Sequence, residues 1–391
     1  MPSKAILCMV RTNPHDHVFY KLRMRELRAL AEVAGYTPVD TMIQTRLKPT
    51  TSYCFGKGKA QELKEKVEAH KADTVIFYNT LSSKQKLNLE RLLYPARVID
   101  RVELTLEIFQ LSSADVFSAL QIMLAFKKKV FPYLKLEAAR RYFRHRAGFR
   151  GGGEYAYMSR VRGLHKEIKA LERKIEKYRR MRADQVRKKL ENGAWIVCIT
   201  GYYNAGKTTL FNLLTGLSMP VSDQPFTTLS SKYGRLLDES REIYLVDTIG
   251  FVLDLDPELI LSFKLNVDDM KAAHILLFML DISEPPLLLK TKLEQGLALL
   301  TEKIGIPEEK IVIVLNKTDL ISPEQADLML KEIAEAADGI PVCRTSAASG
   351  EVSELLATLR DLMEKLKTPQ QKVVKAKTAL KLGLIRRPPP S

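Results

Sequence analysis

The sequence has few cysteines and no long apolar run, and each shortage excludes a class of protein. The four cysteines of the 391-residue chain lie far apart and form no C-x-x-C pair, which argues against a zinc site and a disulfide framework. No apolar stretch approaches the roughly 20 residues of a membrane span, and the first residues lack a secretory pattern. We therefore expect a protein without a transmembrane segment, in a reducing, cytoplasmic compartment.

Acidic side chains are scarce in two segments. The formal net charge is +16. Residues 127–190 hold 22 Lys and Arg against 6 Asp and Glu, and residues 365–391 hold 8 basic side chains and no acid. Residues 194–364 are instead acidic, with 14 basic against 26 acidic side chains. This separation favours a nucleic acid as the partner of the basic segments, and a solvated helical surface is the alternative.

Within the acidic segment stands a complete set of nucleotide-binding motifs. Residues 201–208 read GYYNAGKT and match the phosphate-loop pattern G-x-x-x-x-G-K-[ST]. DTIG at 247–250, NKTD at 316–319 and SA at 346–347 follow in that order. The phosphate loop alone indicates a nucleoside triphosphate, and the NKTD motif indicates guanine. The sequence therefore predicts an enzyme that binds and hydrolyses GTP.

Each motif has a chemical role in that prediction. Backbone N–H groups of residues 201–208 and the following helix would hold the phosphates, with Lys207 on the β- and γ-phosphates. The N–H of Gly250 is placed to sense the γ-phosphate. A switch threonine is also needed, for which Thr228 is preferred over Thr227. The residues predicted to hold Mg²⁺ are Thr208, Thr228 and Asp247, the last through water.

Guanine selectivity is assigned to the two later motifs. The Asp319 carboxylate can accept from N1–H and the exocyclic amine of guanine, with Asn316 supporting it, and adenine lacks those donors. Lys317 would cover the base, and the backbone at 346–347 would meet its carbonyl oxygen. The complete set of predicted GTP contacts is Gly201, Tyr202, Tyr203, Asn204, Ala205, Gly206, Lys207, Thr208, Thr209, Thr228, Asp247, Gly250, Asn316, Lys317, Asp319, Ser346 and Ala347.

The residue after Gly250 is Phe251, where many small GTPases have a Gln that orients water. Phenylalanine cannot do this, so hydrolysis is expected to be slow without help. One source of help is a monovalent cation such as K⁺ held by Asn204, and another is a group from a partner. Asn204 as a merely tolerated loop residue is the alternative. The predicted catalytic residues are Lys207, Thr228, Gly250 and Asn204.

The pattern of elements predicts an α/β protein in four segments. Residues 1–103 alternate strands with helices, as in a small parallel α/β domain. Residues 104–192 read as a basic helical hairpin, 193–367 as a second α/β domain and 368–391 as a basic, proline-rich tail. In the first segment, FGKGK at 55–59 opens a helix; we favour a plain strand–turn–helix joint there over an anion site, because short glycine patterns are weak signals.

The hairpin has a seam of apolar residues at coiled-coil spacing from Val161 to Tyr178, a proline at 132 expected to kink its first helix, and a glycine-rich tip at 148–153. Arginine for phosphates and aromatic rings for stacking are typical of an RNA-contacting loop, although the rings could equally be packing residues. The predicted RNA contacts are Arg140, Arg141, Arg144, Arg146, Phe149 and Arg150.

Taken together, the motifs resemble HflX-type GTPases of the Obg/HflX branch. GYYNAGKTTL, PFTTL, DTIGFV and NKTD carry the resemblance in the G domain, and FGKGKAQEL, VIDRVELTLEIF and GGGEYAYMSRVR carry it before that domain. The chain departs from the family at Tyr203, usually Thr, and at Tyr155 and Tyr157 after the glycines. A basic tail also stands where longer members have a further domain.

The resemblance implies an N-terminal α/β domain, a long hairpin and a Ras-like G domain with a mostly parallel central sheet. It implies binding of GTP and GDP, of the large ribosomal subunit and of rRNA, in ribosome splitting or rescue, with the hairpin tip directed to the peptidyl-transferase centre. A hydrophobic residue at position 251 is a family trait, and some members bind ATP through the N-terminal domain. We expect a monomer. A ribosome-assembly or RNA-binding factor that uses GTP only as a placement switch is the alternative.

Overall fold

The structure is a computed structural model. It describes residues 3–113, 115–145, 152–219, 231–236 and 242–366, with side chains except at 138, 140–145 and 152–158. The described residues pack as two units. The first contains the chain up to Tyr178 together with Leu253–Phe263, and the second contains the rest. The chain thus leaves the second unit at Val252 and re-enters it at Lys264.

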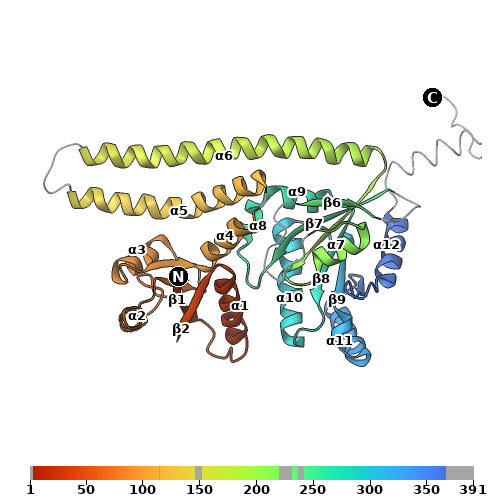
Figure 1. Cartoon of the computed structure of the whole chain (residues 1–391), viewed down its shortest axis with the longest axis horizontal. Helices are drawn as coiled ribbons and strands as arrows, with labels where there is room; N and C mark the ends of the chain where they lie inside the picture. The colour runs from red at the N-terminus through yellow and green to blue at the C-terminus, as the bar shows by residue number, and fades with distance from the viewer. Residues whose placement is uncertain (1–2, 114, 146–151, 220–230, 237–241, 367–391) are drawn as a thin grey trace, which may run out of the picture. The chain divides into compact units, whose positions relative to one another are not determined.

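The first unit is built on a four-stranded parallel sheet of order β2-β1-β3-β4 (Figure 1). Its elements are β1 (Ser3–Arg11), α1 (Phe19–Val33), β2 (Tyr36–Thr45), α2 (Lys57–His70), β3 (Thr74–Phe77), α3 (Ser83–Leu92), β4 (Arg97–Asp100), α4 (Arg101–Ser112), α5 (Val116–His145), the first part of α6 (Gly152–Glu191), and α8 (Pro257–Ser262). The predicted alternation of strands and helices is present.

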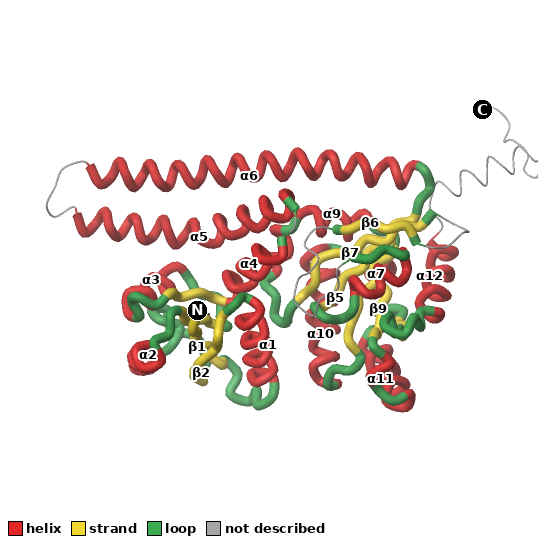
Figure 2. The backbone as a smooth tube through the Cα atoms, viewed as in Figure 1, coloured by secondary structure: helices red, strands yellow, loops and turns green. Residues whose placement is uncertain are grey.

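Helices cover both faces of this sheet, as expected for parallel strands (Figure 2). Ile6 and Cys8 of β1 pack in one cluster with Leu63 of α2 and Leu89 of α3. Helices α1 and α4 contact each other and the sheet. Side chains of every second residue of a strand point to the same face, so the continuous burial of residues 5–10 reflects packing on both sides.

The hairpin is formed by α5 and α6, which lie side by side (Figure 1). Lys127 pairs with Glu167 at 2.5 Å and Lys128 with Glu172 at 2.7 Å. The predicted hairpin segment from residue 104 includes most of α4 before the hairpin proper, because the Asp115 side chain accepts from Ser118 N and begins α5 as a separate helix. Helix α5 continues through Pro132. Helix α6 begins at Gly152, so the last two of the three glycines are helical.

The second unit is built on a six-stranded sheet of order β10-β9-β8-β5-β7-β6, in which only β6 is antiparallel to its neighbour. Its elements after α6 are β5 (Trp195–Tyr202), α7 (Lys207–Thr215), β6 (Lys232–Arg235), β7 (Ile243–Phe251), α9 (Lys264–Ala272), β8 (Ile275–Asp281), α10 (Pro286–Ala298) with a π-helical turn (Leu299–Ile304), a 3₁₀ turn (Glu308–Lys310), β9 (Ile311–Asn316), a 3₁₀ turn (Thr318–Leu320), α11 (Pro323–Ala336), β10 (Val342–Arg344) and α12 (Ser353–Leu366).

The core of the second unit forms around β5, whose residues are all buried. Trp195, the chain's one tryptophan, lies against His274 with ring centroids 4.8 Å apart, and His274 Nδ1 accepts from Ile196 N at 3.0 Å. Strand β7 continues past Asp247 to Phe251, further than the apolar run suggested. A register shift in the β5–β7 pair accommodates this extension. The extension brings the DTIG motif beside the phosphate loop.

Candidate functional site

The phosphate loop (residues 201–208) joins β5 to α7, and backbone geometry explains its glycines. Gly201 has φ +135°, and a Cβ there would lie 2.2 Å from the carbonyl oxygen of Met279. Gly206 has φ +87°, and a Cβ there would lie 2.2 Å from Nδ2 of Asn316. Asn204 is exposed and also has a positive φ, 58°. An ordinary side chain at either glycine would displace neighbouring groups, so the loop fits tightly against the strands on which it rests.

Lys207, the first residue of α7, is buried at the centre of the loop. Its Nζ donates to the carbonyl oxygen of Tyr202 at 2.7 Å. A Cβ on Gly250 would lie 2.9 Å from the same Nζ, so the ammonium group and the backbone of Gly250 are neighbours. Burial lowers the pKa of Lys207 to about 8, against the opposing effect of Asp247. A phosphate that reached Lys207 would also reach Gly250.

Thr208 and Asp247 supply oxygen atoms next to this ammonium group. Thr208 Oγ1 donates to Asp247 Oδ2 at 3.0 Å, and both residues are buried. A hydroxyl and a carboxylate are the hard oxygen ligands that Mg²⁺ prefers, with phosphate oxygens and waters completing its coordination. Over the described residues, no group of three or more His, Cys, Asp or Glu could hold a metal ion. The pair therefore fits a metal bound together with a nucleotide.

Asn316, at the end of β9, connects the phosphate loop to the 346–347 motif. Its Nδ2 donates to Ala205 O at 2.8 Å. Its Oδ1 accepts from Ala347 N at 3.0 Å and from the Thr345 hydroxyl at 3.0 Å. Because Asn316 is buried, with its amide group engaged in this way, the geometry suits it to holding two loops together rather than to touching the base.

Asp319 and Lys317 differ from Asn316 in exposure. Asp319 is exposed, and its Oδ1 accepts from the Ser346 hydroxyl at 2.5 Å, which orients the carboxylate. Lys317 has φ +71° and pairs with Asp281 at 2.7 Å. A fixed, solvent-facing carboxylate can accept two hydrogen bonds from the guanine edge. The structure thus brings the guanine motifs together at the carboxyl ends of β9 and β10, where ligands of open α/β sheets bind.

Phe251 lies in the core of the second unit. It is 1% exposed, and its ring is near those of Tyr202 and Phe278, with centroids 6.1 and 6.4 Å away. The Tyr202 ring is buried too. The contact of Phe251 with the phosphate loop is through its backbone, because its carbonyl oxygen accepts from Tyr203 N at 2.8 Å. A buried ring cannot orient a water molecule, in agreement with the reasoning from sequence.

Several predicted residues cannot be placed. Thr228 and its alternative Thr227 lie outside the described residues, as do Arg146, Phe149 and Arg150 of the hairpin tip. Arg140, Arg141 and Arg144 belong to α5, but their side chains are not described. The tail from 368 onward is also outside the described part.

The second glycine–lysine joint, at residues 55–59, has a different geometry. Gly56 precedes α2 with φ −63°, and its N–H donates to Gln44 Oε1 at 2.8 Å. Lys57 is exposed, and Lys59 pairs with Glu62 at 2.8 Å. A side chain therefore already satisfies the first backbone donor, which favours a plain joint over an anion site. The predicted strand before the turn is absent, because β2 ends at Thr45 and only isolated bridges at residues 50–55 precede α2.

Sequence reasoning missed a group of residues beneath the phosphate loop. Lys292 of α10 is buried, pairs with Glu284 at 2.5 Å and lies over the Tyr202 ring, with 5.1 Å from Nζ to the centroid. It contributes to lowering the pKa of Lys207. Thr345, which bonds Asn316, was missed as well. Neither residue belongs to a local motif, so the sequence carries no short-range signal for them.

Two family profiles match the chain. One, described as GTP-binding GTPase N-terminal, matches residues 21–110, and the other, described as 50S ribosome-binding GTPase, matches residues 196–317. A GTPase HflX of Hyperthermus butylicus is 30% identical over 349 residues, which cover 87% of this chain and 92% of that protein. The chain belongs to the HflX GTPase family. A GTPase HflX of Thermofilum pendens is 36% identical over 77% of this chain and 71% of that protein.

Membership of the HflX family, together with the GTPase profile, makes the chain a GTP-binding and GTP-hydrolysing enzyme. The crystal structure of SsGBP in complex with GDP has a similar fold, with a TM-score of 0.50 and 24% identity over 94% of this chain and 99% of that one. Among the helices that the structure describes, none has the length and apolar character needed to cross a membrane.

Proposed function

We propose that this HflX-family GTPase binds the large ribosomal subunit in a nucleotide-dependent way, in ribosome splitting or rescue. The profile that matches its G domain is described as that of a 50S ribosome-binding GTPase. The observation that carries the proposal is an exposed row of basic side chains on α6, separate from the nucleotide site. Large-subunit RNA is the polyanion that such a row fits.

The row consists of Lys166, Lys169, Arg173 and Lys177, which the structure leaves exposed. Their spacing of three and four residues puts them on one helix face over about 16 Å. No ion pair links these four to a residue of the described part. Lys127 and Lys128 are different, because acidic side chains of α6 neutralise them. The row therefore keeps its charge for an outside partner, and the predicted tip arginines would extend it.

We assign the nucleotide chemistry as the motifs suggest. Lys207 binds the β- and γ-phosphates and Gly250 donates its N–H to the γ-phosphate. Thr208 and Thr228 would hold Mg²⁺, and Asp247 would do so through water; when bound, the ion would supply charge neutralisation on the phosphates. Asp319 selects guanine. The direct bond between Thr208 and Asp247 supports the metal assignment, since it shows that the two oxygen donors meet.

Slow intrinsic hydrolysis follows from the buried Phe251. The missing assistance comes in this proposal from the ribosome, from K⁺ held by the exposed Asn204, or from both. Replacing K⁺ by Na⁺ in the assay tests the cation. If the rate of GTP hydrolysis is the same in Na⁺ as in K⁺ and is unchanged by Asn204→Ala, the cation has no part in the mechanism.

Sedimentation with purified ribosomes tests the main proposal. The protein is expected to co-sediment with large subunits in a non-hydrolysable GTP analogue and to stay in the supernatant in GDP. Equal binding in both states would contradict nucleotide control. An ATP arm tests the suggested second nucleotide at the N-terminal domain, for which residues 55–59 offer no cradle.

The contribution of the α6 row is tested by replacing Lys166, Lys169 and Lys177 with Gln. Affinity for large-subunit RNA should fall, and the slope of log K against log salt should decrease by about 2 to 3, since each phosphate contact contributes roughly 0.7–0.9. The matched control changes three exposed lysines of the acidic unit, Lys271, Lys303 and Lys331, to Gln. An unchanged slope in the first variant would remove the row from the interface.

A second candidate function is supported by Phe251 as well. According to this alternative, the protein is a ribosome-assembly or RNA-binding factor that uses GTP only as a placement switch. Stimulation of hydrolysis separates the two functions. Mature ribosomes should stimulate turnover in the first, whereas in the second only precursor particles or RNA should be bound, without stimulation.

Two minor parts of the proposal have direct tests. The protein is monomeric, which light scattering would check. It resides in the cytoplasm, and its four cysteines, all free and buried, are compatible with a reducing compartment. Fractionation of cells would check the second point.

A further inference from the structure

The segment that follows the DTIG motif packs with the N-terminal part of the chain. Strand β7, which carries Asp247 and Gly250, belongs to the second unit, whereas Leu253–Phe263 belongs to the first. Only Phe251 and Val252 lie between Gly250 and this segment. Any movement of Gly250 toward or away from a γ-phosphate must therefore be absorbed within two residues or passed on to the first unit.

Both backbone groups of Leu253 are bonded to charged side chains of the first unit. Its N–H donates to Glu26 Oε1 of α1 at 3.0 Å, and its carbonyl oxygen accepts from Arg101 Nη1 at the start of α4. Leu253, Glu26 and Arg101 are all buried. Buried hydrogen bonds to charged groups are among the stronger ones, so the position of this peptide is well determined.

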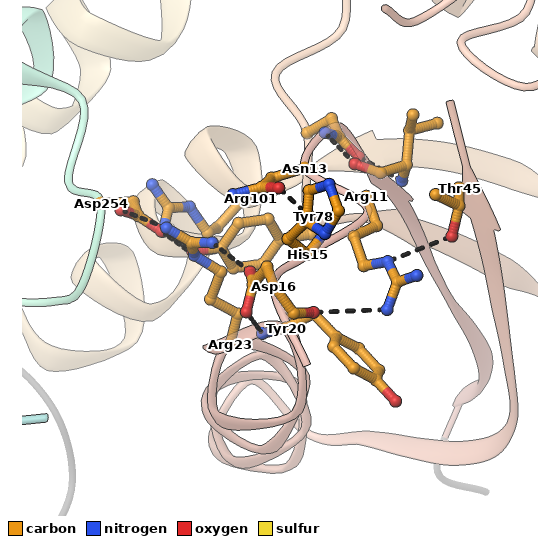
Figure 3. Close-up of polar contacts among 12 residues, drawn as sticks. Arg11, Asn13, His15, Asp16, Tyr20, Arg23, Thr45, Tyr78, Arg101 and Asp254 are labelled. Atoms are coloured by element: carbon orange, nitrogen blue, oxygen red, sulfur yellow. Dashed lines mark hydrogen bonds and ion pairs between the residues drawn. The ribbon is translucent and has the colours of Figure 1, made fainter. Parts of the chain in front are cut away.

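The side chain of the next residue, Asp254, is held by two further residues of the first unit (Figure 3). The guanidinium group of Arg23 in α1 binds the carboxylate in a bidentate way: Nε donates to Oδ2 at 2.6 Å and Nη2 donates to Oδ1 at 3.3 Å. The Tyr78 hydroxyl donates to Oδ2. Arg23 is itself oriented by Asp16 at 3.1 Å, and the guanidinium of Arg101 lies over the Tyr78 ring at 4.6 Å.

The charge and backbone of Asp254 fit this arrangement. Burial acts to raise the pKa of its carboxyl, but hydrogen bonds from Arg23 and Tyr78 outweigh burial and lower the pKa, so the group is ionised. Its φ is +44°, in the left-handed region that Asp tolerates better than most residues. A backbone held in that region by its side chain points to a functional constraint rather than to an ordinary loop.

The rest of the segment is anchored by apolar contacts. Leu259, Ile260 and Phe263 are buried, and Phe263 meets Phe109 of α4 edge to face with ring centroids 4.9 Å apart. The segment is therefore fixed to the first unit along its length. Between this anchor and Gly250, only the backbone of Phe251 and Val252 could change conformation, and both residues are buried.

We propose that Arg23 and Asp254 are positioning residues of the GTPase: they fix the peptide after the DTIG motif and thereby set how strongly the site distinguishes GTP from GDP. The N-terminal domain acts on the nucleotide through this anchor. The inference requires GTP binding by the second unit, and it does not require the ribosome. Its failure would leave the ribosome proposal untouched.

The test compares Asp254→Asn and Arg23→Gln with Asp40→Asn in the full-length protein. Asp40 is a matched control because it also binds a basic partner, Lys66, at 2.6 Å, in the same domain and at similar exposure, 24% against 26% for Asp254. The measured quantity is the ratio of the dissociation constants for GDP and a non-hydrolysable GTP analogue. The two test variants should change this ratio about fivefold or more, as a coupling of ordinary size does, and the control should not.

Further readouts separate positioning from a loss of folding. The double variant Arg23→Gln/Asp254→Asn should give the same ratio as either single variant, because both remove one interaction, and Arg23→Lys should restore part of it. Hydrogen exchange of α1 should differ between GTP-analogue and GDP states in the wild type and lose that difference in Asp254→Asn. Any one of three results would overturn the proposal. The test variants could change the GDP and GTP-analogue affinities equally, Asp40→Asn could shift their ratio as much, or the hydrogen exchange of α1 in the wild type could be the same with both nucleotides.

Discussion

The chain contains two joints in which glycines and a lysine lead into a helix, and they have opposite characters. At residues 201–208 both key glycines have positive φ, and Lys207 is buried. At residues 55–59 the helix starts after a glycine of ordinary φ, and Lys57 is exposed. The comparison teaches that a glycine–lysine sequence can surround a phosphate only where its backbone is held in a closed loop, as the neighbouring strands hold residues 201–208.

The sharpest way to break this comparison is to remove each lysine. Lys207→Ala should lower kcat/KM for GTP by roughly a hundredfold or more, because a buried cation on the transferring phosphate is lost. Lys57→Ala should leave kcat/KM within about twofold, since an exposed lysine outside the site contributes no transition-state contact. Steady-state phosphate release measures both. Equal losses would mean that the joint at residues 55–59 also serves the nucleotide.

Glycine substitutions sharpen the same comparison through stability. Gly201→Ala should destabilise the fold by about 2–4 kcal/mol, since its Cβ would collide with the Met279 backbone and φ is unfavourable for alanine. Gly58→Ala meets nothing within 4 Å inside α2 and should stabilise by up to about 1 kcal/mol. Denaturant unfolding gives both values. A neutral Gly201→Ala would contradict the tight fit of the loop.

The base end of the site can be separated from its phosphate end. Asp319→Asn should weaken GTP binding by about 10- to 100-fold, because a charge-assisted pair of hydrogen bonds is replaced, and should shift preference toward xanthosine triphosphate. Asp327→Asn is the control, an exposed carboxylate of the same unit that binds Arg344 instead. Calorimetric titration with both nucleotides measures the shift. Unchanged GTP affinity would remove Asp319 from base recognition.

The smallest expected effect is the uptake of a fraction of a proton when GTP binds. The pKa of Lys207 is lowered to about 8 in the protein alone, and a bound triphosphate favours its charged form and so raises that pKa. Above pH 8 GTP binding should take up a fraction of a proton, and affinity should fall as pH rises through that pKa. Titrations in buffers of different ionisation enthalpy detect the uptake. It should disappear in Lys207→Ala and persist in Lys57→Ala.

The motifs predicted to form the nucleotide site lie together in the structure, whereas no motif predicted the anchor at Asp254. The phosphate loop, DTIG and NKTD are local patterns that each end a strand, so parallel topology alone brings them to one edge. Arg23 and Asp254 are 231 residues apart and belong to no motif. Their pairing depends on which unit the chain packs against after β7, and hydrophobic periodicity carries no information on that choice. Likewise, the hydrogen bond from Ser118 N to the side chain of Asp115 marks the start of α5, and the helical pattern of residues 104–146 does not reveal that boundary.

The environment of Trp195 has a practical consequence. Because no other indole exists in the chain, selective excitation reports the unfolding of the GTP-binding sheet without interference from the N-terminal one. Protonated His274 is expected to quench this emission. Burial lowers the pKa of His274 below the usual 6.5, and its Nδ1 accepts from the β5 backbone only while neutral. Acidification through the lowered pKa of His274 should therefore dim the emission and loosen β5 at the same time, so that one fluorescence measurement follows the second unit.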